Sequence, residues 1–136
     1  MNDIQASKYL GWFSLGLGAF ELLASRRISR KLGLGSAGLV KAFGAREVAA
    51  GLMVLNKPDT ALPVWGRVAG DALDAGVLLT ALGAGNQKRG NAAGALLLVV
   101  GAAVLDIAVA SSLSRRESKA LQTARRTRVK RQHNAA

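Results

Sequence analysis

Cysteine is absent from the sequence, and histidine occurs once, at His133 in the basic end of the chain. Without cysteine there can be no disulfide, thiolate metal site or thiol nucleophile. With a single histidine outside the apolar body, a Ser-His-Asp triad inside that body and a histidine-based metal site are also excluded. The sequence therefore predicts no catalytic residue, no metal site and no cofactor.

The sequence is also poor in aromatic residues, whereas glycine and alanine are abundant. Small side chains let membrane helices pack closely, because the helix backbones can approach one another. The mean hydropathy is only mildly positive, since a strongly basic end is averaged with long apolar stretches. We expect two regions, a transmembrane domain at residues 1–113 and a basic tail at residues 114–136 that is partly disordered or forms a surface helix.

Four apolar segments follow one another, at about residues 7–24, 37–55, 62–84 and 91–113. Each has close to the roughly 17 to 25 residues that cross a hydrocarbon core of about 30 Å. The connections are short, so sequential helices become antiparallel neighbours. The expected fold is all-α, an integral membrane up-down four-helix bundle. A soluble alanine-rich bundle is the alternative, but it would need a polar stripe on every helix, and the fourth segment has none.

The first connection, residues 25–36, mixes isolated leucine and isoleucine with four basic residues before a glycine-rich break. This composition is typical of a short helix in the membrane interface. Small residues four positions apart predict close packing between helices, chiefly within the chain. These pairs are Ser14 and Gly18, Gly66 and Gly70, and Gly90 and Gly94.

Ionisable residues interrupt the apolar segments. At the bilayer centre each charged side chain costs roughly 2.5 to 3.5 kcal/mol on insertion scales, so these residues should face the bundle interior and pair with one another. Glu21 lies near the end of its segment and is left aside. The candidate intramembrane network consists of Arg46, Glu47, Arg67, Asp71, Asp74 and Asp106.

The depths of these residues suggest particular partners. Arg46 would lie level with Asp71 and Asp74 of the antiparallel third helix, and Arg67 is expected to pair with Asp106. Four acids then face two arginines, so the charges do not balance. Two interpretations stay open: a structural network in which surplus carboxyls are neutral and hydrogen-bonded, or a surplus acid that binds a proton, a cation or a polar ligand group in a central cavity.

The basic tail has the composition that binds anionic lipid head groups, each basic residue contributing about 1 kcal/mol near the surface. The bilayer and its anionic lipids are the expected partners. A protein or nucleic acid is the alternative, and nucleic acid is disfavoured because no aromatic side chain is available for base stacking. The residues expected to contact lipid or a partner are Arg115, Arg116, Lys119, Arg125, Arg126, Arg128, Lys130 and Arg131.

The arrangement of basic and aromatic residues indicates an orientation. The tail carries more basic residues than the connections on the opposite side, and the positive-inside rule then places both termini in the cytoplasm. Tyr9, Trp12 and Trp65 would lie at the same membrane surface, as in an aromatic belt.

Three segments within residues of about 8–110 resemble one known membrane domain: LGWFSLGLGAFELLA, KAFGAREVAAGLMVL and WGRVAGDALDAGVLL. The matching elements are Gly11-Trp12-Phe13-Ser14 with Glu21, Gly44-x-Arg46-Glu47 with Gly51, and Trp65-x-Arg67-x-x-Gly70-Asp71-x-x-Asp74. They resemble the four-helix membrane domain that in bacterial proteins often precedes a polyketide cyclase/dehydrase-like lipid-binding domain.

This resemblance implies a bacterial inner (cytoplasmic) membrane protein whose Arg-Glu and Arg-Gly-Asp-Asp residues form the characteristic centre. It implies no activity, because that membrane domain has none that can be carried over. Only the basic tail follows the fourth helix, so a cyclase or dehydrase activity is not expected.

Three functions remain open for a small multi-pass membrane protein. The first, which we favour, is a non-enzymatic accessory or scaffold component of a larger membrane complex or a homo-oligomer. The alternative is a binding or transport module that uses the acidic and arginine-rich centre for a proton, a cation or a small amphipathic ligand. A membrane enzyme is the least favoured, because the sequence offers no nucleophile, metal cluster or phosphate loop.

Overall fold

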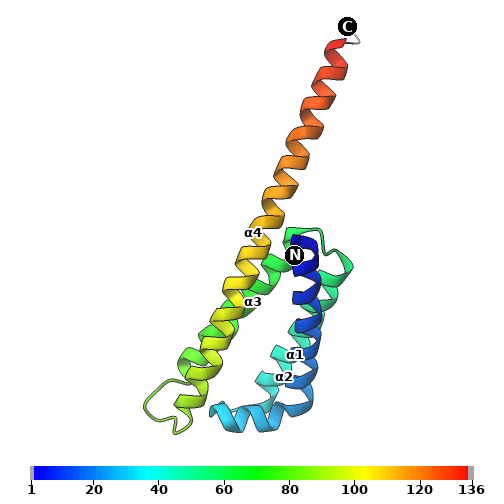
Figure 1. The fold of residues 1–136 in the computed structure, drawn as a ribbon. Helices are drawn as coiled ribbons and strands as arrows, with labels where there is room; N and C mark the ends of the chain where they lie inside the picture. Colours follow the sequence, from blue (N-terminus) through cyan, green and yellow to red (C-terminus); the bar gives the residue numbers. More distant parts are fainter. Residues whose placement is uncertain (1, 135–136) are drawn as a thin grey trace.

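The computed structural model describes residues 2–134 and shows four helices in that part of the chain, without a strand. They are α1 (Asp3–Leu32), α2 (Ala37–Asn56), α3 (Ala61–Thr80) and α4 (Arg89–Asn134). Figure 1 shows two antiparallel hairpins, α1 with α2 and α3 with α4, and the helices pack most extensively within each hairpin. The prediction of an all-helical four-helix bundle is therefore confirmed.

α1 is longer than the sequence indicated at both ends. It begins with a capping box, in which the Gln5 backbone N–H donates to the Asn2 side chain at 2.8 Å and the Gln5 side chain accepts from the Asn2 backbone N–H. No glycine or proline lies between Ala24 and Leu32, so the helix continues until Gly33, whose φ of 67° only glycine adopts readily.

The short helix expected at residues 25–36 is not a separate element, because residues 25–32 are the last turns of α1. Figure 1 shows that these light-blue turns lie at a large angle to the rest of α1, across the lower end of the bundle. The last carbonyl groups of a helix lack partners within it. Here two asparagines that follow α3 in the sequence provide the missing donors. The Asn86 side-chain N–H donates to the Leu32 carbonyl at 2.9 Å, and the Asn91 side-chain N–H donates to the Lys31 carbonyl at 2.8 Å.

At the upper end of the bundle, α4 contacts the N-terminus of α3. Thr60 stands at the N-cap of α3 but makes no side-chain cap hydrogen bond. Instead the Ala61 backbone N–H donates to Glu117 Oε1 at 2.9 Å. A carboxylate near a helix N-terminus also interacts favourably with the helix dipole. Both ends of the bundle therefore carry a polar contact between segments distant in sequence.

α4 continues well past the expected end of its apolar segment at residue 113. It is a single helix of 46 residues, about 69 Å long at 1.5 Å per residue. Figure 1 shows that its last turns project away from the bundle, and the residues from Arg125 to Asn134 are all exposed. In the described residues the basic tail is thus a helix throughout, and residues 135–136 lie outside them.

Glycines set the distance between α1 and α2. A Cβ atom on Gly18 would lie 2.6 Å from the Gly44 carbonyl oxygen, and one on Gly44 would lie 2.8 Å from the Gly18 carbonyl oxygen. Gly11 and Gly51 form a second such pair, two turns away along both helices. Any side chain at these positions would push the helices apart.

The other small-residue pairs behave differently. Gly66, Gly90 and Gly94 have no neighbouring atom within 4 Å of an added Cβ. The prediction that their spacing serves packing within the chain is therefore wrong for these three glycines, whereas Ser14, Gly18 and Gly70 do lie in contacts between helices.

Replacement of Gly18 by alanine should separate α1 from α2. We expect Gly18→Ala to lower the free energy of unfolding by about 1–3 kcal/mol, because the added methyl group meets backbone atoms of α2. Gly16→Ala is the matched control, since nothing lies within 4 Å of its added Cβ. Reversible unfolding in detergent compares the two variants, and equal stability of both would contradict the glycine contact.

Candidate functional site

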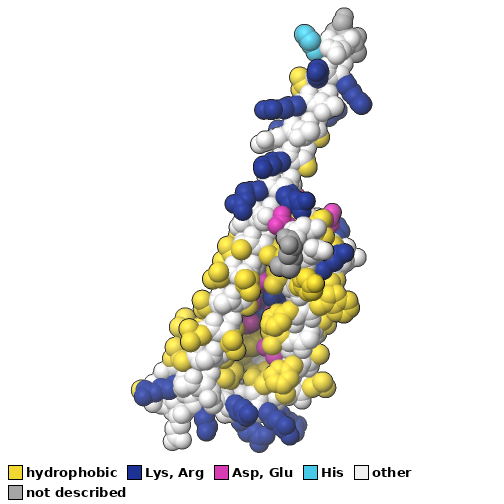
Figure 2. Space-filling view, viewed as in Figure 1, with side chains coloured by type: hydrophobic (Ala, Val, Ile, Leu, Met, Phe, Trp, Pro, Cys, Tyr) yellow, Lys and Arg dark blue, Asp and Glu magenta, His cyan; other side chains and the backbone are white. Residues whose placement is uncertain are grey.

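The bundle has a polar interior and an apolar exterior. Charged side chains are buried on three helices, while many large apolar side chains are exposed. Figure 2 shows hydrophobic side chains over the outer faces of both hairpins and acidic side chains in the hollow between the hairpins. The buried polar residues are Ser7, Ser14, Ser25, Ser29, Glu47, Arg67, Asp71, Asp74 and Asp106.

Arg67 occupies the centre of this interior and is 1% exposed. Its Nε donates to Asp106 Oδ2 on α4 at 2.8 Å, and its Nη1 donates to Glu47 Oε2 on α2 at 3.0 Å. Nη1 also donates to the Ser14 hydroxyl of α1. One guanidinium group therefore joins all four helices, in the fork geometry that suits arginine to carboxylates.

Glycine packing brings α1 into this network. Ser14 lies between Gly11 and Gly18 on the face of α1 that contacts α2, so its hydroxyl reaches the second helix. The hydroxyl lies 2.9 Å from the Glu47 backbone carbonyl and also contacts the Glu47 carboxylate. A bulkier residue at either glycine would withdraw Ser14 from Arg67.

Arg46 forms the second half of the network. Its Nη2 donates to Glu47 Oε1 at 2.8 Å and to Asp74 Oδ2 at 2.6 Å. Gly70 on α3 makes room for this guanidinium, since a Cβ on Gly70 would overlap it. Arg46 is less enclosed than Arg67, because 26% of its side chain is exposed, and its Nε and Nη1 have no hydrogen-bond partner.

The structure contains the predicted ion pair of Arg67 with Asp106, and of the two partners predicted for Arg46, Asp74 and Asp71, it pairs Arg46 with Asp74. Glu47 had no predicted partner. Its two carboxylate oxygens bind the two arginines, one each, so Glu47 links the pairs into one network. The roles of Ser14 and Gly70 were also missed, because neither residue carries a charge that marks it.

The acidic residues outnumber the arginines in the interior. Asp71 is 5% exposed and makes no ion pair within the described residues. Buried carboxylate oxygens without a hydrogen-bond partner occur on four residues. Since a buried unpartnered polar atom is costly, these oxygens mark a place where a proton or a cation would be stabilised. They are Glu21 Oε2, Asp71 Oδ2, Asp74 Oδ1 and Asp106 Oδ1.

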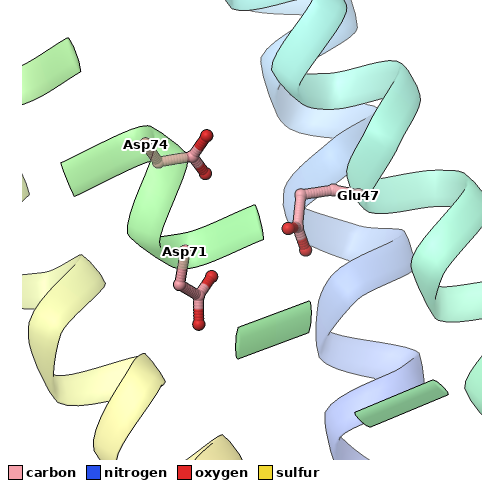
Figure 3. Close-up of side chains that lie close together, drawn as sticks. All are labelled: Glu47, Asp71 and Asp74. Carbon is pink, nitrogen blue, oxygen red and sulfur yellow. The ribbon is translucent and has the colours of Figure 1, made fainter. Parts of the chain in front are cut away.

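Three of the acids converge. Figure 3 shows Glu47 of α2 and Asp71 and Asp74 of α3, with their carboxylates in the space between the two helices. Each offers one oxygen atom, and these atoms lie within 4.8 Å of one another. Asp71 and Asp74 share a helix face because they are three residues apart.

The basic residues of the tail lie apart from this network. Those from Arg115 to Arg131 are exposed on the part of α4 that leaves the bundle (Figure 2). Arg116 contacts Asp3 of α1 through an exposed ion pair of 3.6 Å. The tail is a separate charged surface.

Comparison with protein-family models, curated proteins and solved structures finds no match to this chain. The resemblance to the four-helix membrane domain that precedes cyclase/dehydrase-like domains therefore stays a prediction.

Loss of Arg67 should destabilise the fold strongly. We expect Arg67→Gln to lower the free energy of unfolding by about 3–5 kcal/mol, because Asp106 would keep a buried charge without its ion-pair partner and Glu47 would lose one of its two. Arg116→Gln, which removes an exposed ion pair, should change it by about 0–1 kcal/mol. Unfolding in a mixed detergent series measures both, and a similar small effect of the two substitutions would show that the buried network is not structural.

Proposed function

We propose that this chain is a multi-pass membrane protein in which the four helices cross the bilayer. The observation that carries the proposal is the distribution of side chains: charges are inside, and large apolar residues are outside. In water such a surface would be a strong aggregation liability. In a bilayer it is the expected arrangement, because ionisable residues in membrane helices face the bundle interior and pair.

By length and composition alone, one helix of the described residues qualifies as a membrane span. Of the helices in the described residues, α4 is the one long and apolar enough to cross a membrane, and 11% of its apolar stretch is buried in the bundle. α2 and α3 carry more charges than the apolar stretch of α4, but Glu47, Arg67, Asp71 and Asp74 are buried and would not meet lipid. At 20 residues each, α2 and α3 are about 30 Å long, which matches the hydrocarbon core.

The two ends of the bundle suit the two membrane surfaces. Arg26, Arg27 and Arg30 are exposed at the lower end, and the basic extension of α4 leaves from the upper end. Tyr9, Trp12 and Trp65 are exposed towards the upper end, where an aromatic belt would lie. We place the upper end in the cytoplasm of a bacterium, since it carries the larger number of basic residues.

The role we favour is that of a non-enzymatic accessory or scaffold component. A face of α4 supports it: Gly90, Gly94 and Gly101 have open space around them, and they lie on the apolar part of the helix. Small residues on a lipid-facing helix allow close approach of another helix. The partner would be a transmembrane helix of a second chain.

A second candidate function is the binding or transport of a proton, a cation or a small polar ligand. The unpartnered carboxylate oxygens of Asp71, Asp74 and Asp106 favour it, because a network that served structure alone would balance its charges.

Single cysteines test the membrane proposal, since the natural chain has none that would react. Leu98 is 78% exposed in the middle of the apolar part of α4, whereas Gln87 and Lys119 lie beyond its two ends. In membrane vesicles, Leu98→Cys should resist a charged maleimide, and Gln87→Cys and Lys119→Cys should react from opposite sides. Rapid labelling of Leu98→Cys would instead indicate a water-exposed helix.

The accessory role predicts an assembly that depends on the open face of α4. In a mild detergent, wild type should migrate above its monomer mass on a native gel, and Gly94→Leu should return it to monomer. Gly16→Leu is the control, because Gly16 also faces open space but lies on α1. A monomeric wild type, or an assembly unchanged in Gly94→Leu, would contradict this role.

A further inference from the structure

The three converging carboxylates of Glu47, Asp71 and Asp74 have the chemistry of a site for a hard cation. Oxygen ligands are what calcium and magnesium prefer in proteins. The carboxylates come from two helices, so the site is built by the fold and does not depend on a single loop (Figure 3).

Asp71 provides a second, independent observation that points to a bound cation. It is 95% removed from solvent, since its exposed fraction is 5%, and its Oδ2 has no hydrogen-bond partner. Its carboxylate projects into the space between α2 and α3 that Glu47 also enters (Figure 3). Asp74 Oδ1 is buried and unpartnered as well.

Ligand number and charge select the cation. Magnesium is usually held by one or two carboxylates and keeps several waters, whereas calcium takes more oxygen ligands in a flexible geometry. Three carboxylates that each offer one oxygen, within 4.8 Å of one another, therefore suit calcium better than magnesium. Glu47, Asp71, Asp74 and Asp106 outnumber the two arginines by two charges, which one divalent cation balances.

Arg46 binds two of the three carboxylates, so it would compete with such an ion for them. Its Nη2 already occupies one oxygen of Glu47 and one of Asp74. It is also the more exposed arginine of the network, and two of its three nitrogen atoms make no hydrogen bond, so less holds it in place than holds Arg67.

We propose that Glu47, Asp71 and Asp74 bind a divalent cation of the size of calcium, and that the Arg46 guanidinium competes with it for the Glu47 and Asp74 carboxylates. This site rests on the binding role given above as the second candidate function. In the absence of the cation, Arg46 is the internal counter-ion that keeps the two helices together. When the cation binds, Arg46 loses its contacts with Glu47 and Asp74.

The experiment measures binding of calcium alone to the purified full chain in detergent, by isothermal titration and by 45Ca retention. Wild type should bind one calcium ion per chain and bind magnesium more weakly. Asp71→Asn, which has nearly the same shape, should weaken calcium binding about tenfold or more, because ligand charge sets affinity at such sites.

Arg46→Gln should change affinity in the opposite direction, with calcium bound about tenfold more tightly, because the competing cation is gone. Misfolding cannot produce tighter binding, so this variant keeps the test decisive if Asp71→Asn folds poorly. Lys41→Gln is the matched control: it also removes one positive charge from α2, but Lys41 is exposed and makes no contact with the network. Calcium affinity in this variant should equal that of wild type.

No saturable calcium binding by wild type would overturn the proposal, as would equal binding of magnesium or an unchanged affinity in Arg46→Gln. The cysteine labelling described above is read on the same preparations. A chain that inserts into membranes but does not bind calcium overturns the cation site alone. A chain that does not insert overturns the membrane role instead.

Discussion

The ionic contacts of Arg67 are the constraint on which the rest of the structure depends. A guanidinium so fully enclosed must be compensated, because an unpaired buried charge costs several kcal/mol. Its partners come from α1, α2 and α4, so the position of each hairpin is fixed by a single side chain of α3. The glycine pairs of α1 and α2 follow from this need, since they let Ser14 and Glu47 reach the same point.

The apolar exterior of the bundle accompanies its charged interior. A bundle held together by charges at its centre has few large apolar side chains in its core, which consists mainly of valine, alanine and leucine. Its bulky residues face outward, where lipid would cover them. In a bilayer the apolar surface of a helix gains little from contact with another helix, so close backbone packing and polar contacts hold such helices together. Both are present here.

The number of helices, their antiparallel order and the pairing of Arg67 with Asp106 could be predicted from the sequence, because apolar segment length and residue depth determine them. Residue depth alone left two partners for Arg46, Asp71 and Asp74. The ends of α1 and α4 could not be predicted: basic residues end an apolar run but do not end a helix, and no glycine or proline interrupts residues 24–32 or 113–134. The pairing of Gly18 with Gly44 requires the register of two helices. Gly70 acts by lacking a Cβ where the Arg46 guanidinium lies, and no sequence pattern reveals that contact.

The most direct test of the central role of Arg67 is a double-mutant cycle with Arg67→Gln and Asp106→Asn, measured as free energies of unfolding in bicelles. If the ion pair organises the bundle, the two substitutions should be strongly non-additive, with a coupling energy of about 1–3 kcal/mol. The exposed pair of Arg116 and Asp3, measured in the same way, gives the reference value for a contact that organises nothing. Additivity at Arg67 and Asp106 within about 0.5 kcal/mol would contradict the account.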